Sequence, residues 1–445
     1  MEVDQAQAPR RRWLDVVTVG FGTTVAMWGA GYVGRLPAIP FPGPVLFGLL
    51  LACLVGGGFV LGRRTGLGWR HGALAGLVCG TLNLLVLGSF LGGTGAGKAA
   101  PSALVWLPGS MGAAAALVAI GAAAGSRRGG ARVWPFGPDA FARVAVAAAA
   151  FLLAVGGVVT SAEAGLAVVD WPNSFGYNMF LYPFSRMTGG IYYEHAHRLF
   201  GALVGLTTVA LALVLERTEP RTGVRAAGWL AVAMVVVQGV LGGLRVTGGF
   251  TLSMEPADMR PSLMLAMLHG VLGQVFFATL VVLAVLTSGT WRELGPPRIG
   301  ARADRWQCGI LVVLLLGQLV LGAAQRHGVH PNLLMAHIGL GIAAVVPLAI
   351  HVGFRAWGTN DGVRVLQRAG LALAAGVGVQ LVLGLASYAV TSGPWGTPGI
   401  QVVVTTAHQW LGAVLLGLAV TVWTLYFRVT SAHLRSNGPR ATFSG

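Results

Sequence analysis

Long uncharged apolar stretches, separated by short arginine-rich loops, run through almost the whole chain. Only 10% of the 445 residues are charged and 55% are hydrophobic, whereas a soluble domain keeps roughly a quarter of its residues charged. Such a chain cannot cover a water-facing surface. Its apolar stretches reach the length of about 20 residues that a bilayer-spanning helix needs. The sequence therefore predicts an all-α integral membrane protein.

Twelve candidate transmembrane helices can be delimited between the charged loops. They lie near residues 16–34, 43–62, 72–97, 103–125, 144–162, 199–215, 226–244, 263–288, 306–325, 332–354, 369–391 and 402–427. With the N-terminus in the cytoplasm, 23 of the 30 Lys and Arg residues fall on the cytoplasmic side, as the positive-inside rule requires. We therefore expect a multi-pass protein of a prokaryotic cell membrane, embedded in the lipid bilayer, with both termini cytoplasmic. Because topology accounts for the net charge of +16, no nucleic acid partner is expected.

A polar segment at 126–143, which contains Gly and Pro, separates the first four helices from the last eight. We expect residues 1–130 to form an N-terminal membrane extension of about four helices, to which the sequence assigns no chemistry. The last eight helices show a duplication, since the segments that begin at Gln238, Gln318 and Gln380 share a Gln-x-x-Leu-Gly pattern. Four helices return the chain to its starting side. The duplication therefore predicts two tandem pseudo-symmetric four-helix bundles, at 140–295 and 300–430.

Four histidines follow the same repeat and lie near the outer ends of their helices. His197 and His269 are 72 residues apart, and His337 and His408 are 71 residues apart. Ionisable side chains inside a membrane are costly and point to function. Facing helices of a bundle can present two imidazoles to opposite sides of a heme iron, so the pattern favours heme ligation. A zinc site would need further Cys or carboxylate ligands close by, and the helices of the second bundle offer only Cys308, at the opposite end from the histidines.

The alternative is that each of these histidines is a lone polar residue hydrogen-bonded between helices. We adopt that interpretation for the other six, including His195, which points to roughly the opposite helix face from His197.

The segment Glu194-His195-Ala196-His197-Arg198 contains the densest chemistry of the chain. Glu194 precedes His197 by three residues and so shares its helix face; it could orient that histidine or act as an acid, a base or a radical-stabilising group beside a substrate. Arg198 could bind a heme propionate, because a guanidinium forms paired hydrogen bonds to a carboxylate. Arg245, at the outer end of its helix, is a second propionate candidate. The alternative for Glu194 and Arg198 is an ion pair at the lipid headgroups.

These motifs carry a resemblance to a known family. The segment 156–172 (GGVVTSAEAGLAVVDWP) resembles the first-helix and loop signature of the heme A synthases. The Glu194-x-x-His197-Arg198 motif, the segment 238–246 and the later histidines match the remaining landmarks in order, over about 144–427. The resemblance implies an oxidoreductase that oxidises a methyl group of heme O to a formyl group by successive hydroxylations, giving heme A for terminal oxidases.

The resemblance also implies a role for each of the site residues. In the first bundle, Glu194 would be catalytic, and His197 and His269 would ligate or position the iron of the substrate heme O. In the second bundle, His337 and His408 would be the iron ligands of a heme b cofactor. Heme O synthase or oxidase assembly factors would be suitable partners, and a homo-oligomer is compatible with the family.

Two departures from the family pattern stand out. Many bacterial members carry a cysteine pair in the first outer loop, but residues 162–194 contain no cysteine, and the three cysteines present predict no disulfide. The extension at 1–130 is also additional to the family core. Two other functions remain open: a non-catalytic diheme cytochrome b that transfers electrons, and a transporter. The cytochrome has no evident need for Glu194, and a transporter predicts charges or broken helices near the membrane midplane.

Overall fold

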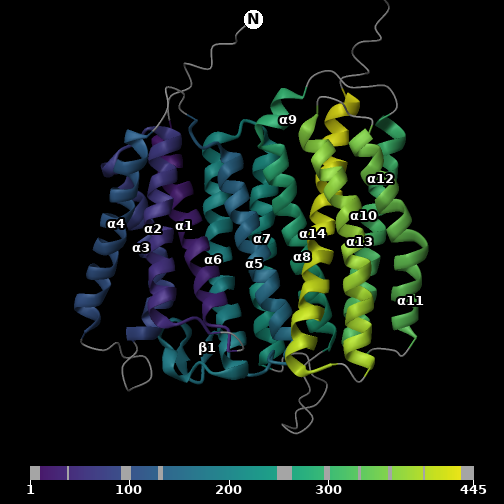
Figure 1. Ribbon diagram of the computed structural model, residues 1–445, viewed down its shortest axis with the longest axis horizontal. Helices are drawn as coiled ribbons and strands as arrows, with labels where there is room; N and C mark the ends of the chain where they lie inside the picture. The colour runs from purple at the N-terminus through teal and green to yellow at the C-terminus, as the bar shows by residue number, and fades with distance from the viewer. Residues whose placement is uncertain are drawn as a thin grey trace, which may run out of the picture. The chain divides into compact units, whose positions relative to one another are not determined.

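The computed structural model describes residues 11–37, 40–91, 102–128, 134–247, 263–294, 301–328, 332–358, 363–393 and 396–431. Twelve helices in these ranges are long and apolar enough to cross a membrane, and one corresponds to each expected stretch. The twelve expected helices and the all-α class are thereby confirmed (Figure 1). Residues 92–97 of the third expected stretch lie outside the described ranges.

The first five helices are α1 (Arg12–Gly34), α2 (Gly43–Thr65), α3 (Trp69–Leu91), α4 (Ala103–Arg127) and α5 (Pro138–Ser161). The ends of α2 follow simple local rules. Pro42 and Pro44 flank its first residue, where a missing N–H costs nothing, and the left-handed Gly66 (φ 66°) caps its last turn.

The loop after α5 contains a short hairpin of β1 (Asn173–Ser174) and β2 (Tyr177–Asn178), followed by the 3-10 turns η1 (Met179–Leu181) and η2 (Phe184–Arg186). Asn173 pairs with Asn178 in antiparallel register. Phe175 and Gly176 connect the strands with φ values of 52° and 75°. Positive φ at both central residues is the conformation that suits a two-residue hairpin turn.

The remaining helices are α6 (Gly189–Thr218), α7 (Thr222–Val246), α8 (Leu263–Leu286), α9 (Gly289–Glu293), α10 (Ala301–Arg326), α11 (Leu333–Leu340), α12 (Val346–Gly358), α13 (Arg364–Ser392) and α14 (Pro398–Ser431). A π-helical segment, η3 (Gly341–Val345), joins α11 to α12, and the three form one span. Helix α6 begins ten residues before the expected stretch at 199–215. Its first turns contain Glu194, His195 and Arg198, which lower the local hydropathy but are hydrogen-bonded within the fold.

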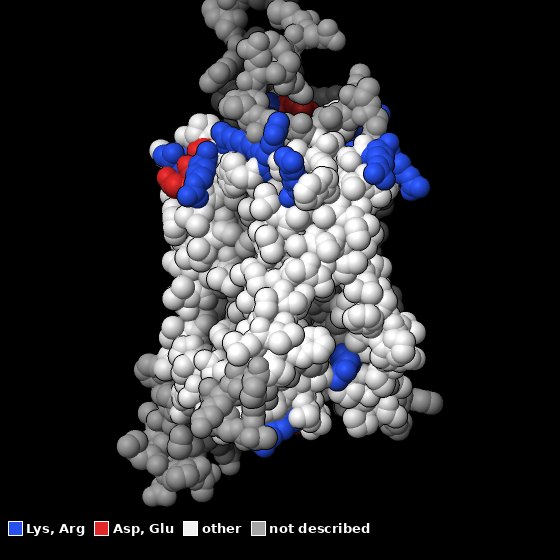
Figure 2. Space-filling model, turned by 90° about the vertical axis from the view of Figure 1, so that its left-hand side faces the viewer, with Lys and Arg blue, Asp and Glu red and all other residues white. Residues whose placement is uncertain are grey.

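The chain divides into two compact units. The first comprises residues 1–151 and 172–219, and the second comprises residues 152–171 and 220–445. In the first unit, α4 packs against both α2 and α3. Figure 2, a view from the side of the molecule on which α4 lies, shows Lys and Arg gathered mainly at one end of the helices, while their middle parts are uncharged. This distribution is typical of a membrane protein with short basic loops on one side.

Glycines allow α2 and α4 to touch backbone to backbone. A Cβ at Gly58 would overlap the Val118 carbonyl oxygen, and a Cβ at Gly121 would overlap the carbonyl oxygen of Val55. Gly62 and Gly125 repeat the arrangement one turn further along. Small residues four apart are the usual means of close helix packing in membranes, where no hydrophobic effect drives helices together.

An aromatic and polar seam joins α1 and α3 of the extension to α6 within the first unit. The indole N–H of Trp28 donates to Asn83 Oδ1 at 2.9 Å, and the Tyr192 hydroxyl donates to the Tyr32 carbonyl at 3.0 Å. The rings of Tyr32 and Tyr192 stack with centroids 5.7 Å apart, and Trp28 packs edge-on against Phe200. The extension therefore supports the N-terminal half of α6, the helix that carries Glu194 and His197.

In the second unit, α10, α11–α12, α13 and α14 pack together around a buried cluster that includes Leu311, Leu373 and Tyr426. Gly353 of α12 and Gly370 of α13 face each other, and a Cβ on either would press on the carbonyl oxygen of the other. Helix α14 also packs against α8. The three cysteines Cys53, Cys79 and Cys308 are free thiols.

Candidate functional site

The structure brings His337 of α11 and His408 of α14 together in the second unit. Their ring centroids are 6.2 Å apart and their planes are 80° apart. Metal–imidazole bonds are about 2 Å long, so two rings that hold one ion in line have centroids about 6 Å apart. In both rings Nδ1 is buried and has no hydrogen-bond partner among the described residues. Neither imidazole is therefore engaged through Nδ1 by another described residue.

Both histidines are held by a glutamine from a neighbouring helix. Gln318 Nε2 in α10 donates to the His337 carbonyl oxygen at 2.7 Å, and Gln380 Nε2 in α13 donates to the His408 carbonyl oxygen at 3.0 Å. Each bond fixes the height of the histidine backbone relative to the neighbouring helix. The sequence showed these glutamines as part of a repeat but gave no sign of this role.

His269 of α8 has the same arrangement with Gln238 of α7. When the amide of Gln238 is oriented to satisfy its neighbours, its nitrogen lies 3.1 Å from the His269 carbonyl oxygen and 2.9 Å from His269 Nδ1. Its oxygen then accepts from the Gly273 backbone N–H at 3.1 Å. An amide that donates to Nδ1 leaves the proton of a neutral imidazole on Nε2.

Glycines make these three contacts possible. Each glutamine is followed four residues later by a glycine, namely Gly242, Gly322 or Gly384. A Cβ on any of these glycines would lie 3.1 to 3.5 Å from Cε1 of the partner histidine ring, so the ring packs directly against the glycine. Each histidine is also followed four residues later by a glycine that faces the glutamine; these are Gly273, Gly341 and Gly412. A Gln-x-x-x-Gly segment thus packs reciprocally against a His-x-x-x-Gly segment. His197 has a glycine at the corresponding position, Gly201, but α5 contains no glutamine.

The π-helical segment η3 begins where Gln318 approaches. A Cβ at Gly341 would lie 2.9 Å from Gln318 Nε2, and the Gly341 N–H bonds the His337 and Ile338 carbonyls. A side chain that inserts against the helix ladder is a known cause of local widening, and π-segments occur often at functional sites. The distortion therefore lies next to His337 because its carbonyl is shared between the helix and Gln318.

In the first unit, Glu194 and Arg198 form an ion pair along α6. Arg198 Nε donates to Glu194 Oε1 at 3.0 Å, and both side chains are less than a tenth exposed. Arg198 Nη1 also donates to the Asn173 carbonyl oxygen of β1 at 3.0 Å. Arg198 thus binds both Glu194 and the hairpin. Burial makes this pair different from an ion pair at the lipid headgroups, whose charges would be screened.

His195 connects the same hairpin to α6. Its Nδ1 lies 3.1 Å from Ser174 Oγ, both side chains are fully buried, and the Tyr182 ring lies 5.1 Å from the imidazole. The expectation that His195 is a hydrogen-bonded structural histidine agrees with this geometry. Together with Arg198, it fastens the hairpin onto the first turns of α6 next to Glu194.

Arg245 belongs to a cationic cluster in the second unit. Its guanidinium lies so close to Gly165 that a Cβ there would be 2.8 Å from Nη2. Burial lowers the pKa of the neighbouring His327 below its ordinary value, and the charges of Arg245 and Arg326 lower it further. Arg326 Nη2 donates to the Thr160 carbonyl at 2.8 Å and lies 3.9 Å from the exposed carboxylate of Glu163. Neither Arg326 nor His327 stood out in the sequence, because they lie at the end of α10 and directly after it, outside any motif.

Comparison with known protein families matches residues 139–330 to COX15-CtaA, described as "Cytochrome oxidase assembly protein". No curated protein and no solved structure matches the chain. The matched region contains Glu194, His197, Arg198, Arg245 and His269, and it ends before His337 and His408. It confirms the family that the sequence motifs indicated. Residues 139–330 are thus similar to the COX15-CtaA family of cytochrome oxidase assembly proteins, and in the described part of the chain four further apolar helices precede that region.

Proposed function

We propose that this protein is a heme A synthase, which oxidises a methyl group of heme O to a formyl group by successive hydroxylations. The observation that carries the proposal is the buried Glu194–Arg198 pair, located in the family-matched region three residues from His197. An electron-carrying cytochrome needs imidazole ligands but has no use for a buried carboxylate beside one of them. We place this active site in the bundle at 140–295.

Glu194 is suited to act on a substrate because it is shielded from water and held in place by the guanidinium of Arg198 at 3.0 Å. A carboxylate can accept a proton from a reacting group or stabilise positive charge that develops beside it. Ser174, Asn173 and His195 keep the outer loop against α6 and exclude water from this position.

The roles of His197 and His269 differ in this proposal. Because Gln238 donates to His269 Nδ1, the ring proton belongs on Nε2, where it can be donated to the substrate. We therefore assign His269 to substrate positioning. His197 is the better candidate for the iron of heme O, because it shares a helix face with Glu194 three residues before it. The carboxylates of the porphyrin would suit the cationic cluster around Arg245, and Arg198 is the second candidate to bind them.

The bundle at 300–430 would hold a heme b between His337 and His408. The structure describes no group of three or more His, Cys, Asp or Glu side chains that could hold a metal ion. An ion between two imidazoles therefore has to bring its remaining ligands, and a porphyrin brings four nitrogens. When bound, this group would carry electrons between the substrate site and an external acceptor. Gln318 and Gln380 would hold its two ligands at fixed height.

The cellular setting follows from the same proposal. We place the protein in the plasma membrane of a prokaryote, with both termini in the cytoplasm, because most basic residues then lie inside. Heme O synthase, as the source of the substrate, and oxidase assembly factors, as recipients of the product, are the partners that this reaction calls for. Association of several copies is compatible with the fold.

The proposal is tested by co-expressing the chain with a source of heme O and analysing the extracted hemes. We expect heme A from the wild type and heme O or an alcohol intermediate from Glu194→Gln. Glu216→Gln, an exposed carboxylate at the other end of the same helix, is the control and should still give heme A. Heme-loaded, folded wild-type protein that yields no heme A would refute the enzyme and favour a diheme cytochrome b.

A further inference from the structure

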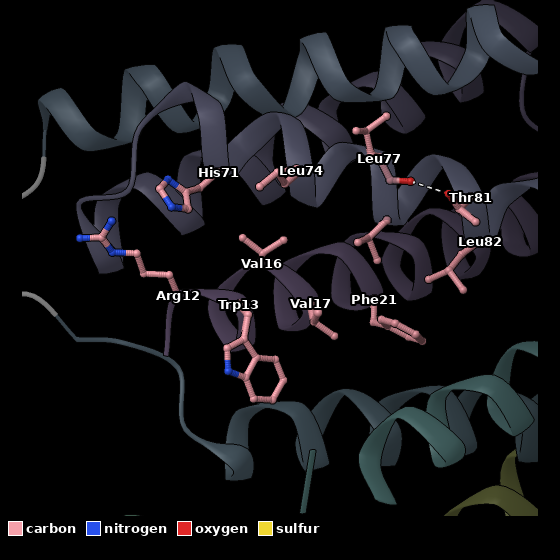
Figure 3. Close-up of a pocket in the computed structure, with 11 residues that line it drawn as sticks. Arg12, Trp13, Val16, Val17, Phe21, His71, Leu74, Leu77, Thr81 and Leu82 are labelled. Carbon is pink, nitrogen blue, oxygen red and sulfur yellow. Dashed lines mark hydrogen bonds between the residues drawn. The ribbon is translucent and has the colours of Figure 1, made fainter. Parts of the chain in front are cut away.

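A groove of about 690 Å³ runs along α1 and α3 in the first unit, far in sequence from the four histidines of the heme pattern. Figure 3 shows its apolar side chains following both helices. Its buried floor is formed by Val16, Phe21 and Leu82, and its exposed rim by Trp13, Leu74 and Leu77. The volume lies within the range of small-ligand sites, roughly 300–1,000 Å³.

The groove is apolar along its length. Thr81 is the one hydroxyl among its lining residues, and it donates to the Leu77 carbonyl within α3 at 2.9 Å. Its proton is therefore not available to a ligand. A hydrocarbon chain is the ligand that such walls can bind.

One end of the groove is cationic. Arg12 and His71 both lie at this end, as Figure 3 shows. Neither forms an ion pair with any residue that the structure describes. Asp15, the carboxylate closest to Arg12 in α1, is fully buried and accepts from the Phe136 N–H at 2.7 Å. It faces the segment before α5 and does not compensate the charge of Arg12 through a hydrogen bond.

We propose that this groove binds one anionic phospholipid of the leaflet at the arginine-rich end of the helices. An acyl chain lies along α1 and α3, and the phosphate contacts Arg12 and His71. Trp13 on the rim suits the headgroup level, where amphipathic rings are enriched. A free phosphate would make no use of the apolar walls, and an isoprenoid quinone would make no use of Arg12.

The test is a competition between two lipids that share their chains. The full-length protein is placed in nanodiscs with equal amounts of phosphatidylglycerol and phosphatidylcholine, released into the gas phase, and its retained lipids are counted by native mass spectrometry. The wild type should retain phosphatidylglycerol preferentially. Arg12→Gln should reduce that preference about fivefold, since one basic residue near anionic lipid contributes about 1 kcal/mol.

Two matched variants control the experiment. Arg128→Gln removes an exposed charge beyond the end of α4 and should leave the preference unchanged. Val17→Trp fills the groove and should reduce retention of both lipids, whereas Leu104→Trp, at a position 83% exposed outside it, should not. Circular dichroism of each variant confirms folding. Equal retention of the two lipids by the wild type, equal effects of the two arginine variants, or a quinone retained in place of phospholipid would overturn the proposal.

Discussion

Replacing Gln318 by leucine tests whether the glutamine contact controls the histidine that we assign to heme b. Leucine keeps most of the side-chain volume but removes the amide that donates to the His337 carbonyl at 2.7 Å. The carbonyl keeps its bond from the Gly341 N–H, so it is not left unpaired. The change therefore isolates one neutral hydrogen bond between two helices.

The expected size of the effect follows from that single bond. A neutral intramolecular hydrogen bond contributes about 0.5–1.5 kcal/mol, and measured values between membrane helices average about 0.6 kcal/mol. If the bond is needed to hold His337 in the ligating position, heme affinity should fall roughly two- to tenfold. Gln380→Leu should act similarly on His408. The double variant should deviate from additivity, because the two ring centroids lie 6.2 Å apart and the rings would share one iron.

The assay measures heme per chain in purified protein and the rate of heme loss to an excess of an apoprotein acceptor. The low-temperature EPR spectrum supplies a readout of ligand orientation that a general loss of stability would not change. Gln325→Leu, an exposed glutamine of the same helix, is the matched control. If Gln318→Leu retains heme as well as Gln325→Leu, with an unchanged EPR spectrum, the assigned role of the glutamine contact is wrong.

Three further changes test the packing and the electrostatics. Gly58→Ala should destabilise the protein by about 1–3 kcal/mol, because its Cβ overlaps the Val118 carbonyl. Gly56→Ala, with open space around it, should leave the stability unchanged in detergent unfolding. Equal unfolding midpoints for the two variants would contradict this packing. Tyr192→Phe should lower the free energy of unfolding by about 1 kcal/mol and reduce the yield of heme A, because it removes the hydrogen bond that holds α6 to α1. A full yield of heme A would show that the seam does not position the site. The pKa of His327 is lowered in the folded state, so the unfolded state binds more protons as the pH falls below 6.5, and the stability of the fold should decline there. His327→Asn should make the melting temperature less dependent on pH in this range. An unchanged pH dependence would exclude this histidine as its source.

The sequence by itself determined the class of fold and the positions of all twelve membrane helices. That success has a simple cause, because a bilayer demands about 20 apolar residues per helix and leaves charged residues to the loops. The start of α6 was misjudged for the same reason. Glu194, His195 and Arg198 read as polar in a hydropathy window, whereas hydrogen bonds to one another and to the hairpin accommodate them inside the helix.

The sequence also selected the histidines, because their spacing repeats with the helices. It did not show what holds them. Gln318 and Gln380 lie 19 and 28 residues from their partners and reach them only because neighbouring helices pack side by side. The same packing explains the glycines that lie four residues after each glutamine and each histidine. They leave space for a ring or an amide of the neighbouring helix, and the sequence of one helix does not show that neighbour.

Tertiary structure likewise decided the placement of the N-terminal extension. In the sequence it is a Gly- and Ala-rich addition without ligands, but Trp28, Tyr32 and Asn83 contribute to the seam that holds α6. The length and hydrophobicity of a membrane helix can be read from its own sequence. The partner of each of its faces depends on contacts between residues far apart in the chain, and only the assembled helices specify those contacts.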